Sequence, residues 1–296
     1  MPYKASKIYY DGSHYIAVPK ENFPSRKCGK AARKSDTQTD SVKAKFEAAY
    51  AESQALPKRE RKQYIAEQLQ DDFATVEEAN EYARRQTERK RNNACKRYTR
   101  LWRKVYLQSK WDYFVTFTYD NDKHTEESFR QSLRNTLKHL VSRKGWKYIG
   151  VWERSPQKKR LHFHGLFYIP DGTMPGMPVD VIDYNFKAHR RVVTHQNSYF
   201  NDRFGRSDFA PIEDRQMLGS AVAYIVKYLE KTGEKIVYSK GLPQYFLSDI
   251  MEEDVVCPFG LEDKKLLLYD DFRCWDEGVL IGAVSKDVIR QMPKSN

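Results

Sequence analysis

Two histidines and a glutamate are spaced so that they could share one face of a β-hairpin. Residues 161–169 alternate so that His162 and His164 should point to the same side of a strand. The strand expected at residues 147–153 ends on Glu153 and is joined to this one by the polar loop RSPQKKR. If the loop closes with Glu153 opposite His162, their Cβ atoms would be about 4.5–5.5 Å apart. Two nitrogens and one carboxylate would then form a divalent-metal site with positions open to water or substrate. The alternative is a pair of structural histidines.

Two tyrosines are spaced one helical turn apart in a later segment. Residues 215–231 predict an amphipathic helix, with Tyr224 and Tyr228 together on its flank. Both phenols could therefore approach one reactive point. Lys227 lies beside them, and a nearby ammonium favours the phenolate. The alternative is that the tyrosines are packing residues beside the apolar stripe. That stripe comprises Leu218, Val222, Ile225 and Leu229.

The surrounding pattern predicts the elements that must position these groups. The segment 147–169 reads as an antiparallel hairpin because the connection is short. The helix at 215–231 should end at Gly233. Further expected elements are a strand at 113–119, a helix at 125–144 with an apolar stripe, and a short strand at 208–212.

The N-terminal third predicts a hairpin at residues 1–20 and two or three helices between residues 41 and 110. Ten basic residues occur between 84 and 104 against the single acid Glu88. Basic side chains crowded on one helix face repel one another unless phosphates lie nearby. We therefore expect this face to bind DNA. The alternative is a solvated helix face. The basic residues are Arg84, Arg85, Arg89, Lys90, Arg91, Lys96, Arg97, Arg100, Arg103 and Lys104.

The charge distribution divides the 296-residue chain, whose net charge is +12, into three parts. Residues 1–110 carry +11, residues 111–240 carry +6 and residues 241–296 carry −5. We therefore expect a basic, mainly helical extension at 1–110, a catalytic domain at 111–245 and an acidic accessory segment at 246–296. No apolar run approaches the about 20 residues of a membrane span, and the four cysteines form no C-x-x-C pair. A cytoplasmic protein is expected.

Three motifs in a fixed order resemble those of HUH-type rolling-circle replication initiators, as found in small single-stranded DNA phages, plasmids and related mobile elements. They are VTFTYD, then WERSPQKKRLHFHGLFY, then AYIVKYLEK, within about residues 111–245. The second contains a His-hydrophobic-His motif and the third the two-tyrosine form of the nucleophile motif. The tyrosines follow the histidines, as in replication initiators and small transposases, whereas relaxases have the reverse order.

The resemblance implies an α+β fold with a central antiparallel sheet of about five strands and flanking helices. It implies that His162, His164 and Glu153 bind Mg²⁺ or Mn²⁺. Tyr224 would be the leading nucleophile and Tyr228 the second, with Lys227 steadying the phosphate or the phenolate. The implied function is nicking of single-stranded origin DNA through a 5′-phosphotyrosine, followed by rejoining. A bacterial host would supply the helicase and the polymerase, since the chain has no P-loop sequence.

Three other functions stay open from the sequence. A single-strand tyrosine transposase would use the same chemistry on another target. A non-catalytic nucleic-acid-binding sheet would use Phe163, Phe167 and Tyr168 to stack on bases or fill the core. A metal-dependent hydrolase with a TIM barrel would need further ligands on later parallel strands, for which His189 and His195 are the remaining candidates.

Overall fold

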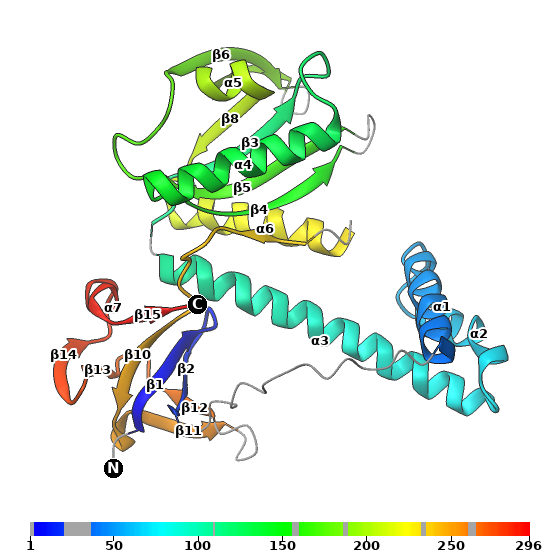
Figure 1. Ribbon diagram of the computed structural model, residues 1–296. Helices are drawn as coiled ribbons and strands as arrows, with labels where there is room; N and C mark the ends of the chain where they lie inside the picture. The colour runs from blue at the N-terminus through cyan, green and yellow to red at the C-terminus, as the bar shows by residue number, and fades with distance from the viewer. Residues whose placement is uncertain are drawn as a thin grey trace. The chain divides into compact units, whose positions relative to one another are not determined.

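Figure 1 shows the computed structural model of the protein. It describes residues 3–20, 37–108, 110–155, 160–185, 189–231, 235–259 and 265–296, without the side chains of residues 37–40, 185, 228–231 and 258–259. The chain forms two compact units. The first unit contains residues 1–20 and 101–296, and the second contains residues 21–100.

A five-stranded antiparallel sheet is the centre of the first unit, in the order β8-β3-β5-β4-β9. This arrangement confirms the predicted α+β fold and the predicted hairpin of the second motif. All strand pairs among the described residues are antiparallel, so the TIM-barrel alternative is wrong. The strands are β3 (Tyr113–Tyr119), β4 (Lys147–Arg154), β5 (Leu161–Tyr168), β8 (Gly205–Pro211) and β9 (Val237–Tyr238).

Helices cover both faces of this sheet because side chains alternate along each strand. Helix α4 (Glu126–Lys144) packs on one face together with α5 (Ser198–Phe204), and Phe163 and Phe167 fill the core beneath them. Helix α6 (Arg215–Lys231) packs on the other face, against residues such as Leu166. The predicted stripe of α4 is buried: Phe129, Leu133, Leu137 and Leu140. The predicted end of α6 at Gly233 lies outside the described residues.

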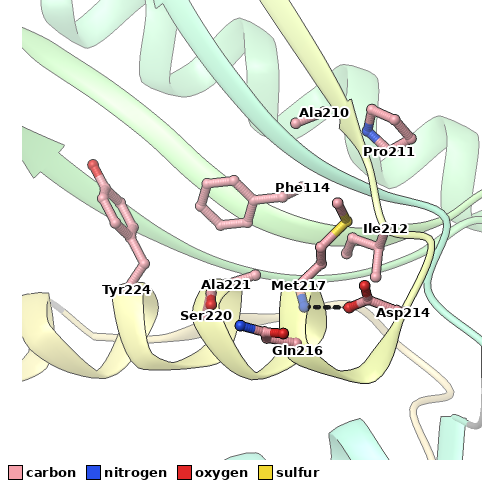
Figure 2. A pocket seen from close by; sticks show the side chains of 10 residues that line it. All are labelled: Phe114, Ala210, Pro211, Ile212, Asp214, Gln216, Met217, Ser220, Ala221 and Tyr224. Atoms are coloured by element: carbon pink, nitrogen blue, oxygen red, sulfur yellow. Dashed lines mark hydrogen bonds between the residues drawn. The ribbon is translucent and has the colours of Figure 1, made fainter. Parts of the chain in front are cut away.

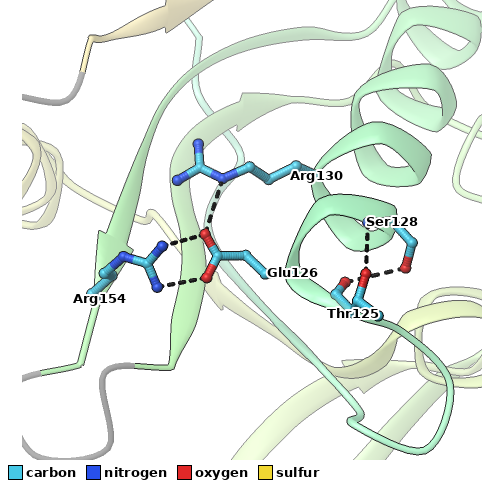
Figure 3. Close-up of polar contacts among 5 residues, drawn as sticks. All are labelled: Thr125, Glu126, Ser128, Arg130 and Arg154. Carbon is cyan, nitrogen blue, oxygen red and sulfur yellow. Dashed lines mark hydrogen bonds and ion pairs between the residues drawn. The ribbon is translucent and has the colours of Figure 1, made fainter.

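An ion-pair network ties the start of α4 to the end of β4 (Figure 3). The Thr125 hydroxyl caps the helix by accepting a hydrogen bond from the backbone N–H of Ser128. The Arg154 guanidinium binds both carboxylate oxygens of Glu126, and Arg130 lies 3.6 Å from the same carboxylate. Because Arg154 is the last residue of β4, these contacts fix the strand end that carries the candidate metal ligand Glu153.

The segment between β5 and α6, for which the sequence predicted only a short strand, contains more regular structure. Strands β6 (Pro178–Asn185) and β7 (Arg190–Asn197) form an antiparallel ribbon, followed by α5 and β8. The predicted strand at 208–212 overlaps the second half of β8 (Gly205–Pro211), which begins earlier and ends one residue sooner. His195 lies on the ribbon, hydrogen-bonded to Asp180.

A second sheet in the first unit joins the two ends of the chain. The N-terminal hairpin of β1 (Tyr3–Tyr10) and β2 (Tyr15–Val18) pairs with β10 (Tyr245–Ile250) and β12 (Lys265–Leu268). The predicted boundaries at 110 and 246 therefore differ from the structure, since ladder hydrogen bonds place the hairpin with the acidic segment. The other elements are β11 (Val255–Phe259), β13 (Arg273–Asp276), β14 (Val279–Ala283), α7 (Lys286–Gln291) and β15 (Lys294–Ser295).

Helices build the second unit, as the sequence predicted for residues 41–110. Helix α1 (Thr37–Ser53) and α2 (Arg61–Glu67) pack on the first part of the long helix α3 (Val76–Gln108). Their small core includes Phe46, Ile65 and Leu69, each almost fully buried. The last turns of α3 belong to the first unit. No helix in the described parts of the chain has the length and apolarity needed to span a membrane.

Candidate active site

The two histidines and the glutamate lie on one face of the sheet, as the alternation predicted. Glu153 on β4 is directly opposite His162 on β5, which confirms the expected register. Oε2 of Glu153 lies 2.8 Å from Nε2 of His164, and the two imidazole rings are 5.9 Å apart. His164 and Glu153 are buried, at 7% and 5% exposed. Partial removal from water strengthens each of these polar contacts.

Strand β3 orients both histidines through hydroxyl groups. Oγ1 of Thr118 lies 2.7 Å from Nδ1 of His162, and Oγ1 of Thr116 lies 2.9 Å from Nδ1 of His164. A hydroxyl can donate or accept, so either imidazole tautomer is satisfied. Each contact fixes the ring at Nδ1 and directs Nε2 away from β3.

The pKa of His162 is lowered to about 4, chiefly because burial disfavours the imidazolium and secondarily because His164 is adjacent; Glu153 acts in the opposite direction. The imidazole of His162 is therefore neutral near pH 7. Only a neutral imidazole can offer a lone pair to a metal ion.

Helix α6 brings Tyr224 to Glu153 and His164. Val222 and Ile225 bury the apolar stripe of α6 against the sheet, which leaves the Tyr224 ring on the helix flank. The Tyr224 hydroxyl donates a hydrogen bond to Oε2 of Glu153 at 3.0 Å, and its ring lies 5.1 Å from that of His164. The predicted nucleophile and two of the three predicted metal ligands are therefore in direct contact.

The other predicted residues of α6 are not shown to share this site. Lys227 is exposed. The side chain of Tyr228 lies outside the described residues, so its expected approach to the same point stays a prediction.

The carboxylate suits Mg²⁺ or Mn²⁺, and two histidines with one carboxylate are a ligand set that divalent first-row ions use with positions left open. Among the side chains that the structure describes, however, no three of His, Cys, Asp or Glu gather as they would around a metal ion. His164 and Glu153 hydrogen-bond to each other instead. The neutral His162, the two oriented rings and the ionisable carboxylate fit the expected metal as a donor set.

The ten predicted DNA-binding residues separate into two groups along α3. Lys104 is only 3% exposed, and its ammonium donates to the carbonyl of Leu242. Arg103 pairs with Asp11 at 2.5 Å. These contacts in the first unit correct the expectation for Lys104, because a buried ammonium cannot reach a phosphate. The other eight residues lie in the second unit, where Lys90 is half-buried and the remaining seven are exposed.

A basic groove runs between α1 and α3 in the second unit. Its volume is about 520 Å³, and among the described residues its only acidic lining residue, Glu47, is paired with Lys90. Arg84 is outside the groove and pairs with Glu81 and Glu88. The cationic residues that line the groove are Lys43, Arg89, Lys90, Lys96, Arg97 and Arg100.

One comparison with known proteins gives a match to part of the chain. Residues 112–233 match the model of the family described as Replication-associated protein ORF2/G2P. The match supports a replication-initiator family. It covers less than half of the chain, from the start of β3 to the end of α6, and thus includes every residue of the candidate active site. No curated protein and no solved structure matches the chain significantly.

Three residues were not found from the sequence: two of the candidate active site in the first unit and one of the basic groove in the second. Thr116 and Thr118 alternate in β3 with the same period as the two histidines, which is a signal that the strand pattern contains. Only the register of β3 against β5 shows that these threonines lie opposite the two histidines. Lys43 joins the basic groove from a different helix, and no spacing in the sequence relates it to α3.

Proposed function

We propose that this protein is an HUH-type endonuclease that starts rolling-circle replication by nicking single-stranded origin DNA through Tyr224. The observation that carries the proposal is the hydrogen bond from the Tyr224 hydroxyl to Glu153, whose same oxygen contacts His164. A phenol held by a carboxylate beside two histidines is the arrangement that an activated nucleophile requires. The family match agrees with a role in replication initiation.

In the proposed step, Oη of Tyr224 attacks the scissile phosphorus and the bond between phosphorus and O3′ breaks. The phenolic proton passes along the existing hydrogen bond to Glu153 and on to water, and O3′ takes up a proton from water, so that the carboxylate is restored and no net proton is gained or lost. The products are a 5′-phosphotyrosine and a free 3′-hydroxyl. The phosphodiester between two nucleotides is replaced by one between the tyrosine and the 5′ end, so the energy of the broken bond is kept for rejoining. The 3′-hydroxyl would prime a host polymerase.

His162, His164 and Glu153 would hold the metal ion. When bound, Mg²⁺ or Mn²⁺ would neutralise the charge of the phosphate. The protonation state and the orientation of the histidines suit metal binding. His162 is neutral near pH 7, and Thr116 and Thr118 orient the two imidazole rings.

Tyr228 is proposed to act after Tyr224, at the end of one round of synthesis. Tyr228 would cut after one round of synthesis while Tyr224 still holds the 5′ end, and Lys227 would steady the phosphate or the phenolate. A host helicase would unwind the duplex, in the bacterial cytoplasm.

The deciding experiment uses labelled single-stranded DNA from the protein's own replicon, with Mn²⁺ or with EDTA. A covalent adduct should form only with metal and should disappear in Tyr224→Phe. The matched control is Tyr269→Phe, because Tyr269 is an exposed tyrosine directly after β12 and outside the candidate active site. An adduct in Tyr224→Phe that is as abundant as in the wild type would refute the assignment of the leading nucleophile.

The same experiment separates the alternatives. Metal-independent binding without any adduct would favour the non-catalytic sheet domain. Its stacking residues Phe163 and Phe167 are already 1% and 0% exposed, so they cannot meet bases without unfolding. A transposase would join its covalently held strand to a second target DNA, whereas an initiator would rejoin its own origin.

We propose further that the basic groove of the second unit holds the backbone of origin DNA. Affinity should fall steeply with salt as phosphate contacts release counterions, with a slope that decreases by about 0.7–0.9 for each cation removed. Arg89→Glu combined with Lys96→Glu should flatten the salt dependence measured by fluorescence anisotropy. Lys58→Glu combined with Lys62→Glu is the control, since both lie in the same unit outside the groove. Equal slopes in the two double variants would contradict this assignment.

A further inference from the structure

A pocket adjoins the candidate nucleophile on the same face of the sheet (Figure 2). Its volume is about 630 Å³, within the range of small-ligand sites of roughly 300–1,000 Å³. It lies between α6, the edge strand β8 and the start of β3. Phe114 and Tyr224 line one end of it, Met217 and Ile212 the other.

The pocket is mostly apolar, and its polar lining residues are Asp214, Gln216 and Ser220. The Asp214 carboxylate already accepts a hydrogen bond from the backbone N–H of Met217 (Figure 2). Phe114 offers a half-buried aromatic ring, 5.4 Å from the ring of Tyr224 and nearly parallel to that of His164. Met217, 44% exposed, adds a flexible apolar side chain that can adapt to a planar ligand. Gln216, from the first turn of α6, supplies both hydrogen-bond donors and an acceptor. An aromatic face with an amide nearby is suited to a nucleobase.

The position of the pocket indicates where along the DNA strand its base would lie. Phe114 is directly opposite Leu166 in the ladder, and the next residue on the same face, Thr116, is opposite His164. The pocket is thus one step along the sheet from the site where Tyr224 would meet a phosphate. We propose that it receives a nucleobase next to the scissile phosphate, stacked on Phe114 and contacted at its edge by Gln216. This inference rests on the proposed nicking function, and it assigns to that function a residue set for recognising the cut site.

The first test measures binding without cleavage. A fluorescein-labelled 16-nucleotide single strand of mixed sequence is titrated with protein in EDTA. Met217→Trp fills the pocket and should weaken binding at least about fivefold, the lower bound for losing one stacked base. Ala223→Trp is the matched control, because Ala223 is an exposed residue of α6 outside the lining. Phe114→Leu keeps an apolar side chain but removes the aromatic face, and should weaken binding as Met217→Trp does. Equal affinities in Met217→Trp and Ala223→Trp would overturn the proposal.

The second test locates the base. A single-stranded library with a randomised window is incubated with Mn²⁺, and the covalently captured strands are sequenced. We expect a base preference at one position beside the nick, and Gln216→Ala should relax that preference. An abasic substitution at that position should abolish capture of the strand. An unchanged preference in Gln216→Ala together with equal capture of all abasic strands would overturn the pocket assignment. Failure to capture any strand, with the binding difference retained, would instead refute the nicking function.

Discussion

The threonines of β3 give the sharpest test of how the site is organised. Thr116→Val and Thr118→Val each keep the shape of the side chain and remove one hydroxyl, which lies 2.9 Å from His164 and 2.7 Å from His162 respectively. In the proposed site these hydroxyls hold the ligand rings without touching the metal or the DNA. The threonines are therefore positioning residues.

The magnitude follows from the burial of each ring. His164 is 7% exposed, so its Nδ1 cannot be satisfied by water when Thr116 loses its hydroxyl. A buried polar group left without a partner costs about 1–3 kcal/mol of stability. His162 is half-buried, so Thr118→Val should cost less. Removing such an orienting partner typically lowers metal affinity or activity about 10–100-fold.

The assay measures adduct yield against Mn²⁺ concentration, with thermal unfolding in EDTA alongside. Each variant should shift the half-maximal Mn²⁺ concentration upward about 10–100-fold. The two variants should differ in unfolding temperature, with Thr116→Val the lower. Thr136→Val is the control, because Oγ1 of Thr136 is buried in α4 without a hydrogen-bond partner among the described residues. That change should be neutral or stabilising and should leave the Mn²⁺ dependence unchanged.

The reasoning is refuted if Thr116→Val and Thr118→Val respond to Mn²⁺ like the wild type. A uniform loss of stability in both, with the Mn²⁺ midpoint unchanged, would show that the hydroxyls support the fold alone.

Three further predictions concern the first unit. Gly150→Ala should lower the free energy of unfolding by about 1–3 kcal/mol in urea denaturation, because an added Cβ would collide with the buried Phe163 ring and approach the backbone oxygen of the next strand to 2.9 Å. Burial raises the pKa of Asp208 in the folded state, so its carboxylate opposes folding as pH rises above the unfolded pKa of about 4. Asp208→Asn should therefore raise the unfolding temperature at pH 7 and leave it unchanged near pH 2. The thiol of Cys274 is buried and its pKa is raised to about 12, so in native protein at pH 8 it should resist iodoacetamide while the exposed Cys95 reacts, as mass spectrometry can show.

Each of these has a clear contrary result. Unfolding of Gly150→Ala at the wild-type urea concentration would mean that the two strands can separate at no cost. An Asp208→Asn variant that gains stability equally at pH 2 and pH 7 would remove ionisation as the cause. Alkylation of Cys274 at the rate of Cys95 would contradict its burial.

The sequence by itself determined the local elements and the chemistry of the site. Alternation in residues 161–168 places His162 and His164 on one face whatever the rest of the fold does, because the period of a strand is two. The short connection to the preceding strand makes an antiparallel pair, and only one register sets Glu153 opposite His162. The stripe of α6 likewise determines that Tyr224 lies on the flank of the helix. These inferences depend on neighbours along the chain or across one hairpin.

Only the tertiary structure decided which distant residues meet. The contact of Tyr224 with Glu153 joins residues 71 positions apart, and the threonines reach the histidines through a ladder of which the sequence gives no register. The N-terminal hairpin was predicted, yet its pairing with β10 and β12 was not, because an edge of unpaired N–H and C=O groups can accept any strand. The burial of Lys104 was missed for the same reason: local pattern cannot tell a phosphate-facing lysine from one whose ammonium is held by a carbonyl 138 residues away. Long-range packing selects between such outcomes, since it alone determines which polar groups lose water.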